Sequence, residues 1–232
     1  MEEQTFALIT FDVYSALFDV TGTLLQPVQQ TLHLGMEEAY SFVQEWRRLQ
    51  LEYTLIQSLL QKGHISFRTV TQRALDVTLH RYQKSLDETT KTFLLGLWDD
   101  LTPWPEARST LQTLQEQGFR LALLSNGDRD MLEALAAKLD VSLAHVFSAQ
   151  DAGVYKPHPA IYRLPVICLG VEPSRILHVA GSARDVMGAK AAGLVCAWRN
   201  AREDTVFDPA YRADAEAPDL VTLLQAIRPR VL

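Results

Sequence analysis

Two aspartates that can act as nucleophiles stand seven residues apart near the start of the chain. Asp12 ends the apolar run Phe6-Ala-Leu-Ile-Thr-Phe11, and Asp19 ends the shorter run Tyr14-Ser-Ala-Leu-Phe18. A carboxylate at the end of a strand can attack an electrophilic carbon or phosphorus and form a covalent intermediate. VYSALFD follows Asp12 and VTGTLL follows Asp19, so the two aspartates predict two different reactions.

Further reactive groups follow apolar, β-rich runs later in the chain. Ser125 and Asn126 come after LALL, Lys156 comes shortly after HVFSAQDAG, and Ser182 and Asp185 come after ILHVA. The carboxyl ends of parallel strands meet at one edge of a sheet, where ligands bind. A carboxylate that meets hydroxyl and amide donors, a lysine and a second acid there favours covalent catalysis by aspartate.

The elements that must position these groups alternate between strand and helix patterns. Five runs predict short strands, with helical patterns between most of them: FALITFD, LALLSNGD (121–128), HVFSAQDAG (145–153), ILHVAGSARD (176–185) and LVCAWRN (194–200). Such alternation is typical of an α/β fold built on a doubly wound, mostly parallel sheet.

A long helical segment interrupts this pattern after the first strand. Apolar residues recur at helical spacing over 37–60, and further helical stretches are predicted over 66–82 and 87–101. We therefore predict a core of residues 1–22 and 102–232 and an inserted all-helical cap of residues 23–101. A cap at this point in the chain would cover the strand ends and exclude water from a site there.

Composition excludes several classes of partner. A net charge of −6 and a pI near 5.5 argue against nucleic acid binding, which needs a concentrated basic surface. The acidic start MEEQT and the lack of a long apolar run predict a cytoplasmic protein without membrane contact. Cys168 and Cys196 lie in apolar stretches and are predicted to be buried free thiols. The six histidines show no ligand spacing, so no metal site is predicted.

The segments FDVYSALFD, EWRRLQLEYTLIQSLL, LLSNGD, VYKPHPAIY and HVAGSARDVMGAKAAG resemble those of the haloacid dehalogenase superfamily. WRRLQLEYT resembles its (S)-2-haloacid dehalogenase branch in particular. The first loop of that branch reads Asp-x-Tyr-Gly-Thr-Leu-x-Asp, and residues 12–19 match it in register, with Tyr14 and Asp19 in place. The resemblance implies that Asp12 displaces halide from C2 of a small carboxylate with inversion. Water then hydrolyses the aspartyl ester, no metal is required, and the protein forms a homodimer.

The resemblance also implies roles for later residues. It assigns binding of the departing halide and the substrate carboxylate to Arg47 on the cap. The other matched positions are the strand-end pair Ser125 and Asn126, Lys156 near the nucleophile, Tyr162 six residues beyond it, and Asp185, which helps to activate water. Leu51, Leu60 and Phe67 are candidates for an apolar wall around the alkyl part of the substrate.

The chain departs from the family pattern at several positions. Ser15-Ala16 replaces Gly-Thr in the first loop, Ala180 and Ser182 replace Ser and Asn in the last loop, and Arg184 replaces a tryptophan that lines the pocket. Each hydrogen bond lost from a reacting group costs on the order of ten- to a thousandfold in rate.

Two alternative functions remain open from the sequence. DVTGTLL resembles the loop of phosphatases, which would make Asp19 the nucleophile of a Mg²⁺-dependent enzyme. That function is less favoured, because Ala180 stands where phosphatases place an aspartate. The second alternative, a non-catalytic binder of small anions, follows from the polar groups lost at Ala16, Ala180 and Ser182.

Some of the same residues also have simple structural explanations. Asp128 is predicted to cap a helix, His178 to be a hydrogen-bonded core residue, and Tyr162 either to pack a helix on the sheet or to reach the site.

Overall fold

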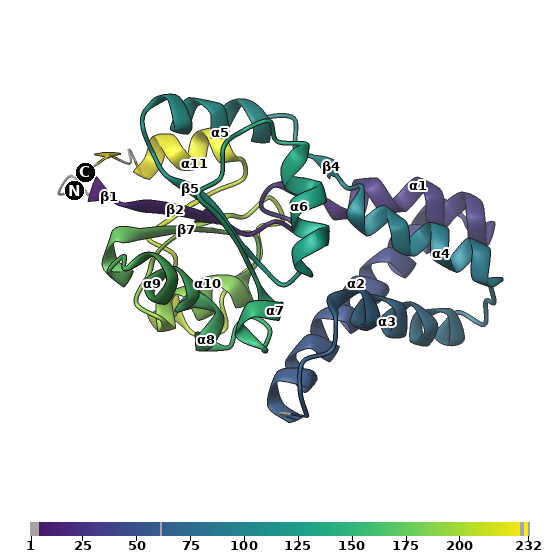
Figure 1. The fold of residues 1–232 in the computed structure, drawn as a ribbon. Helices are drawn as coiled ribbons and strands as arrows, with labels where there is room; N and C mark the ends of the chain where they lie inside the picture. The colour runs from purple at the N-terminus through teal and green to yellow at the C-terminus, as the bar shows by residue number, and fades with distance from the viewer. Residues whose placement is uncertain (1–4, 61, 228–229, 232) are drawn as a thin grey trace.

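A computed structural model of the chain describes residues 5–60, 62–227 and 230–231. Its centre is a six-stranded parallel sheet (Figure 1), which confirms the predicted α/β class. The strands lie in the order β6 (His145–Ser148), β5 (Leu121–Ser125), β2 (Leu8–Phe11), β7 (Ile176–Ala180), β8 (Val195–Arg199) and β9 (Ala215–Ala217). The five predicted strands are present, and the edge strand β9 is an addition.

The central strand β2 decides where the site forms. All four of its residues are buried, as expected for a strand covered on both faces. It pairs with β5 on one side and β7 on the other, so the residues that follow these three strands are neighbours. The chain order changes direction around β2, which makes its carboxyl end a topological switch point.

Helices cover both faces of the sheet. In Figure 1, α5 (Ala107–Glu116) and α11 (Leu220–Ile227) lie on one face, and α9 (Leu164–Leu169) and α10 (Ala183–Ala191) lie on the other. The remaining elements of this part are α6 (Arg129–Ala137), α7 (Ala149–Ala152), α8 (Pro159–Tyr162), the 3-10 turns η2 (Pro173–Arg175) and η3 (Pro209–Tyr211), and the parallel pair β1 (Thr5–Phe6) and β10 (Arg230–Val231).

A separate helical body follows β2 and lies beyond the carboxyl ends of the strands (Figure 1). It contains α1 (Val20–Leu32), α2 (Met36–Leu60), α3 (Phe67–Arg81), α4 (Glu88–Gly96) and the 3-10 turn η1 (Leu97–Asp99). The two chain crossings that connect it to the sheet, β3 (Phe18–Asp19) and β4 (Thr102–Pro103), pair with each other in an antiparallel ribbon. The helices predicted over 37–60, 66–82 and 87–101 are present, the last as α4 and η1.

Helix α1 begins directly after β3. The VTGTLL segment, which resembles a phosphatase loop, forms the first turns of α1. Asp19 caps this helix by accepting a hydrogen bond from the Gly22 backbone N–H at 2.8 Å. Val20, Leu24 and Val28 recur at helical spacing and are buried, which stabilises the helix despite Pro27.

Asp128 joins the helical body to the sheet. Its buried carboxylate accepts hydrogen bonds from the Phe67 backbone N–H at 2.8 Å and the Arg68 backbone N–H at 3.0 Å. Asp128 occupies the N-cap position of α6, as predicted, but its side chain makes no capping bond to that helix. It therefore caps α3, a helix about sixty residues earlier in the chain.

The two cysteines, both predicted to be buried, differ in their exposure. Cys196 is buried, whereas Cys168 is exposed, which contradicts its predicted burial. Cys168 lies beside the exposed Ile167 on the short helix α9, whose outer face does not contact the core. Within the described residues, no helix has the length and apolar character needed to cross a membrane.

Candidate active site

Asp12 lies directly after β2, at the switch point of the sheet. Its backbone N–H donates to the Val179 carbonyl at 2.9 Å, which continues the pairing with β7. Two donors converge on its Oδ1 atom: the Ser125 hydroxyl at 3.0 Å and the Lys156 ammonium at 3.2 Å. In the described residues no donor bonds Oδ2, so this oxygen is available to a ligand.

Lys156 connects Asp12 to the second acid of the site. Its Nζ atom lies 2.9 Å from Asp185 Oδ2 and 3.4 Å from His178 Nε2. The Tyr162 hydroxyl donates to Asp185 Oδ1 at 2.8 Å. The sequence-predicted residues Asp12, Ser125, Lys156, Tyr162 and Asp185 thus form one continuous hydrogen-bonded cluster at the strand ends.

The charged groups of this cluster shift one another's pKa values. Asp12, Lys156 and Asp185 are 8%, 7% and 3% exposed, so their charges are poorly solvated. Burial raises the pKa of Asp12, although the charge of Lys156 opposes this effect. Burial would also raise the pKa of Asp185, but Lys156 and His178 outweigh it and hold that pKa well below its usual range. The lysine between two acids keeps its proton, because their charges outweigh its desolvation and raise its pKa.

Close backbone contacts shape the loop after Asp12. Ser15, which replaces the family's glycine, has a left-handed φ of 79°, a conformation that glycine adopts without strain. A Cβ on Gly181 would lie 2.5 Å from the Ala16 backbone nitrogen, so only glycine fits at that contact. The Ser15 carbonyl accepts hydrogen bonds from the Trp104 indole at 3.1 Å and the Arg199 guanidinium at 3.3 Å. The position of Asp12 therefore depends on contacts with residues that lie about ninety or more positions later in the chain.

Asp19 has a different environment from Asp12. Its side chain caps α1, and its carbonyl accepts a hydrogen bond from the Thr23 hydroxyl at 2.6 Å. No lysine or arginine of the described residues forms an ion pair with it. The strand-end residues Ser125 and Lys156 bond Asp12 and not Asp19.

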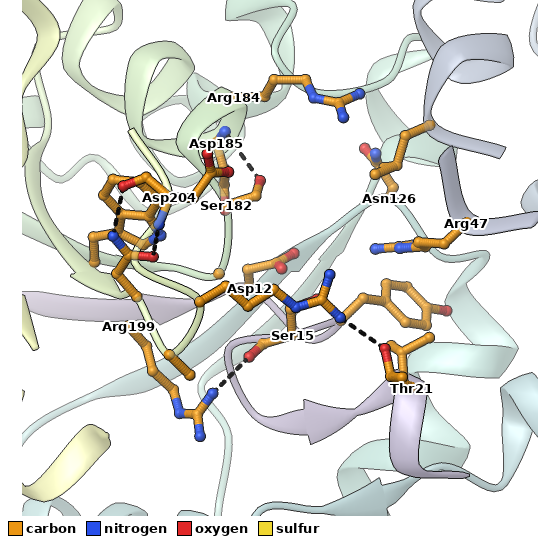
Figure 2. Close-up of a pocket in the computed structure, with 18 of the residues that line it drawn as sticks. Asp12, Ser15, Thr21, Arg47, Asn126, Ser182, Arg184, Asp185, Arg199 and Asp204 are labelled. Carbon is orange, nitrogen blue, oxygen red and sulfur yellow. Dashed lines mark hydrogen bonds between the residues drawn. The ribbon is translucent and has the colours of Figure 1, made fainter. Parts of the chain in front are cut away.

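A cavity of about 400 Å³ opens above Asp12, between the strand ends and α2. Figure 2 shows Arg47, Asn126, Ser182, Arg184 and Asp185 around it. Among the predicted substrate-binding residues, Tyr14, Leu51, Asn126 and Ser182 line the cavity, whereas Tyr162, Phe67 and Leu60 do not. Phe67 is fully buried with its ring 5.1 Å from that of Tyr14, and Leu60 is 55% exposed. The prediction that these two residues form part of an apolar wall around the substrate is therefore wrong.

Arg47 reaches the cavity from α2. Its guanidinium lies over the Tyr14 ring at 5.4 Å and over the Trp98 ring at 5.5 Å, and it donates to Gln50. Burial lowers the pKa of Arg47 to about 10, although the charge of Asp12 acts in the opposite direction. The arginine remains a cation at neutral pH and faces the same cavity as Asp12 (Figure 2).

Sequence reasoning missed the part that His178 plays. Its Nδ1 atom lies 2.9 Å from the Thr10 hydroxyl, and its Nε2 atom lies 3.0 Å from Asp185 Oδ2. The prediction of a hydrogen-bonded core residue is confirmed, but the residue also contacts Asp185 and Lys156. The available signal was a histidine inside a strand that is otherwise wholly apolar. No group of three or more His, Cys, Asp or Glu in the described part of the chain is placed to hold a metal ion.

A parallel α/β sheet with an acid after its central strand, a neighbouring lysine and a second acid, all facing a helical body, is the architecture of haloacid dehalogenase-like hydrolases. The model of the haloacid dehalogenase-like hydrolase family matches residues 15–193. The chain therefore belongs to this family.

Within this family, the chain is most clearly similar to 2-haloacid dehalogenases. The (S)-2-haloacid dehalogenase of Pseudomonas sp. (strain YL) is 33% identical over 94% of this chain and 91% of its own. The solved structure of an L-2-haloacid dehalogenase superposes with a TM-score of 0.90 at 29% identity, covering 97% of this chain and 100% of the other. An L-2-haloacid dehalogenase from Xanthobacter autotrophicus, solved with chloropropionic acid covalently bound, superposes with a TM-score of 0.83 at 29% identity, covering 97% and 99%. These similarities confirm the resemblance to the (S)-2-haloacid dehalogenase branch.

Proposed function

We propose that this protein hydrolyses the carbon–halogen bond of small (S)-2-haloacids through an ester on Asp12. The observation that carries this proposal is the asymmetry of the Asp12 carboxylate. Ser125 and Lys156 both hold Oδ1, which leaves Oδ2 to attack C2 of a substrate in the cavity. Positioning of a buried carboxylate against a bound substrate is the main contribution that the protein makes to such a displacement.

In the first step the Asp12–C2 bond forms as the carbon–halogen bond breaks, and the configuration at C2 inverts. Arg47 is the cation that faces this step from the cap, and we assign the substrate carboxylate and the departing halide to it. Asn126 accepts a hydrogen bond from the Lys156 backbone N–H at 2.8 Å, which fixes the loop that carries the lysine.

In the second step water attacks the carboxyl carbon of the Asp12 ester and releases the (R)-2-hydroxyacid and a proton. Lys156 contacts both Asp12 and Asp185, and we assign the orienting of the water to Asp185 and Lys156. Tyr162 and His178 act as positioning residues, because each bonds Asp185 and fixes its orientation. Ala16 and Ala180 contribute no hydroxyl to either step, so Ser182 is the remaining side-chain hydroxyl of the last loop that lines the cavity.

We further propose that the reaction requires no metal ion. The Lys156 ammonium lies between the two carboxylates and supplies the positive charge there. Residues 23–101 then act as a cap that carries Arg47 and excludes water, and residues 1–22 and 102–232 form the catalytic core. The homodimer and the cytoplasmic location remain predictions, which light scattering and cell fractionation test.

Chloride release from (S)-2-chloropropionate in excess EDTA tests the proposal, with Asp12→Asn and Asp19→Asn as a matched pair of variants. We expect release by the wild type and by Asp19→Asn, because asparagine also caps helices, and none by Asp12→Asn. The organic product is expected to be (R)-lactate.

Two outcomes contradict this proposal. Turnover of a phosphate ester that EDTA abolishes and Asp19→Asn removes would establish the phosphatase alternative. Binding of propionate without chloride release from any acid would establish the non-catalytic binder.

A further inference from the structure

Three arginines line the cavity without a carboxylate partner. Arg47, Arg184 and Arg202 all contribute to its wall. Among the described residues, none of the three has an Asp or Glu oxygen within 4.0 Å. The other two cations of the wall do have partners: Lys156 contacts Asp12 and Asp185, and Arg199 contacts Glu106. Arg47 and Arg184 are half-buried and Arg202 is exposed. Charges withdrawn from water are usually paired, so the two half-buried guanidiniums need an explanation.

Arg184 is the most distinctive of the three. It lies in the first turn of α10, directly before Asp185, and is half-buried. Its side chain makes no hydrogen bond to the described residues, and Figure 2 shows it extending over the cavity from the side opposite the Ser15 loop. The nearest acids that influence it are Asp204 and Glu52, and neither forms an ion pair with it.

Arg202 approaches from the loop after β8 and makes bonds only to neutral side chains in the described structure. It donates to the Thr21 hydroxyl at 2.7 Å and to the Gln44 amide oxygen at 2.9 Å. These bonds orient the exposed guanidinium. Asp19 and Asp204 also line the cavity, but in the described structure neither forms an ion pair with Arg202. The charges of Arg184 and Arg202 both lower the pKa of Arg47, so each of them repels Arg47 across the cavity.

The size of the cavity also exceeds the needs of a three-carbon acid. A volume of about 400 Å³ falls in the range of ~300–1,000 Å³ that is usual for pockets that hold drug-sized ligands. (S)-2-chloropropionate has about six non-hydrogen atoms and one negative charge, so it would leave both volume and positive charge unused. A second anionic group on the substrate would use both.

We propose that the preferred substrates are 2-halo-dicarboxylic acids, with the carboxylate on C2 bound by Arg47 and the distal carboxylate bound by Arg184 and Arg202. The proposal rests on the function proposed above and specifies its substrate class. With (S)-2-chlorosuccinate, Asp12 forms a bond to C2 as chloride leaves. Water then hydrolyses the ester to give (R)-malate and a proton, and the distal carboxylate is unchanged.

The test compares kcat/KM for (S)-2-chlorosuccinate with that for its 4-methyl ester, which has the same chain but no distal charge. We expect the wild type to prefer the diacid by at least about tenfold, because its distal carboxylate forms charge-assisted hydrogen bonds that the neutral ester lacks. Arg184→Met and Arg202→Met should each reduce this preference about tenfold or more. Arg163→Met is the matched control, since Arg163 is exposed and lies outside the cavity, and it should keep the wild-type preference.

Equal kcat/KM values for the diacid and its monoester, with chloride released from both, would overturn this inference and leave the proposed function standing. If the protein releases chloride from none of the chlorinated acids, the proposed function fails. The distal carboxylate site is then tested by the binding of unreactive acids. Calorimetry should then show that the wild type binds succinate at least about tenfold more tightly than butyrate, and that Arg184→Met loses this difference. Equal binding of the two acids would refute the proposed distal site. Circular dichroism of each variant excludes misfolding as the cause of a loss.

Discussion

Removal of the Lys156 charge should destabilise the fold in a way that depends on pH. The Lys156 ammonium is 3.2 Å from Asp12 and 2.9 Å from Asp185, and it is 7% exposed. At an effective dielectric constant of ~20, each contact corresponds to a Coulomb attraction of about 5 kcal/mol. Desolvation of the ammonium offsets much of this attraction, so Lys156→Met should lower the free energy of unfolding by about 3–5 kcal/mol near pH 7.

The destabilisation should become smaller at lower pH. Without Lys156, burial and mutual repulsion raise the pKa of both carboxyls in the folded protein above that of an unfolded aspartate. A carboxyl with a raised folded pKa destabilises the protein above that pKa, and the penalty disappears as pH falls and the group takes up a proton. Urea unfolding of the wild type and Lys156→Met near pH 7 and near pH 5 measures both quantities.

Lys190→Met provides the matched control for this experiment. Lys190 forms an ion pair with Asp214 at 2.7 Å, close to the Lys156–Asp185 distance, but its side chain is 24% and that of Asp214 40% exposed. Its removal should cost less than about 1 kcal/mol, because solvent screens such pairs. A loss below about 1 kcal/mol for Lys156→Met near pH 7, or an equal loss at both pH values, would refute the argument that Lys156 neutralises two buried acids.

Three further predictions concern the reaction itself. In a single turnover in ¹⁸O-labelled water, the hydroxyl of the product should carry ¹⁶O from Asp12, and labelled product would rule out the ester. KM for (S)-2-chloropropionate should rise as pH passes about 10, since Arg47 is charged below its lowered pKa and neutral above it, and a flat KM through this range would contradict its assigned role. Gly181→Ala should reduce kcat by about tenfold or more, because its Cβ would lie 2.5 Å from the Ala16 nitrogen and displace the loop that carries Asp12. Unchanged kcat would show that the loop adapts.

The parts of the site that could be predicted from the sequence are those carried by strand ends. Parallel strands bring their carboxyl ends together, so residues far apart in sequence, such as Asp12, Ser125 and Lys156, could be expected to meet. The register of β2 with β7 could not be predicted, and this register places His178 between Thr10 and Asp185. A buried histidine in one strand therefore gave no indication of its partner in another.

Two other differences arise from tertiary contacts. β9 consists of Ala215–Ala217, which contains none of the β-branched or aromatic residues that typify strands, and it forms because it pairs with the edge of β8. Asp128 precedes α6 and reads as the cap of that helix, but the donors that it reaches belong to α3. A cap supplied from another part of the chain is a tertiary contact and leaves no pattern in the local sequence.

The Asp128 contact links movement of the helical body to local folding. Any motion that lifts α3 from the sheet exposes the backbone donors of Phe67 and Arg68 and leaves the Asp128 carboxylate without them. Hydrogen bonds to a charged group contribute about 1.5–3 kcal/mol each, so an open form that breaks both would be populated at roughly one per cent or less. Separation of α3 from the loop after β5 and fraying of the first turn of α3 are thus a single equilibrium. Hydrogen exchange at those two amides would report how often the helical body separates from the sheet at this contact.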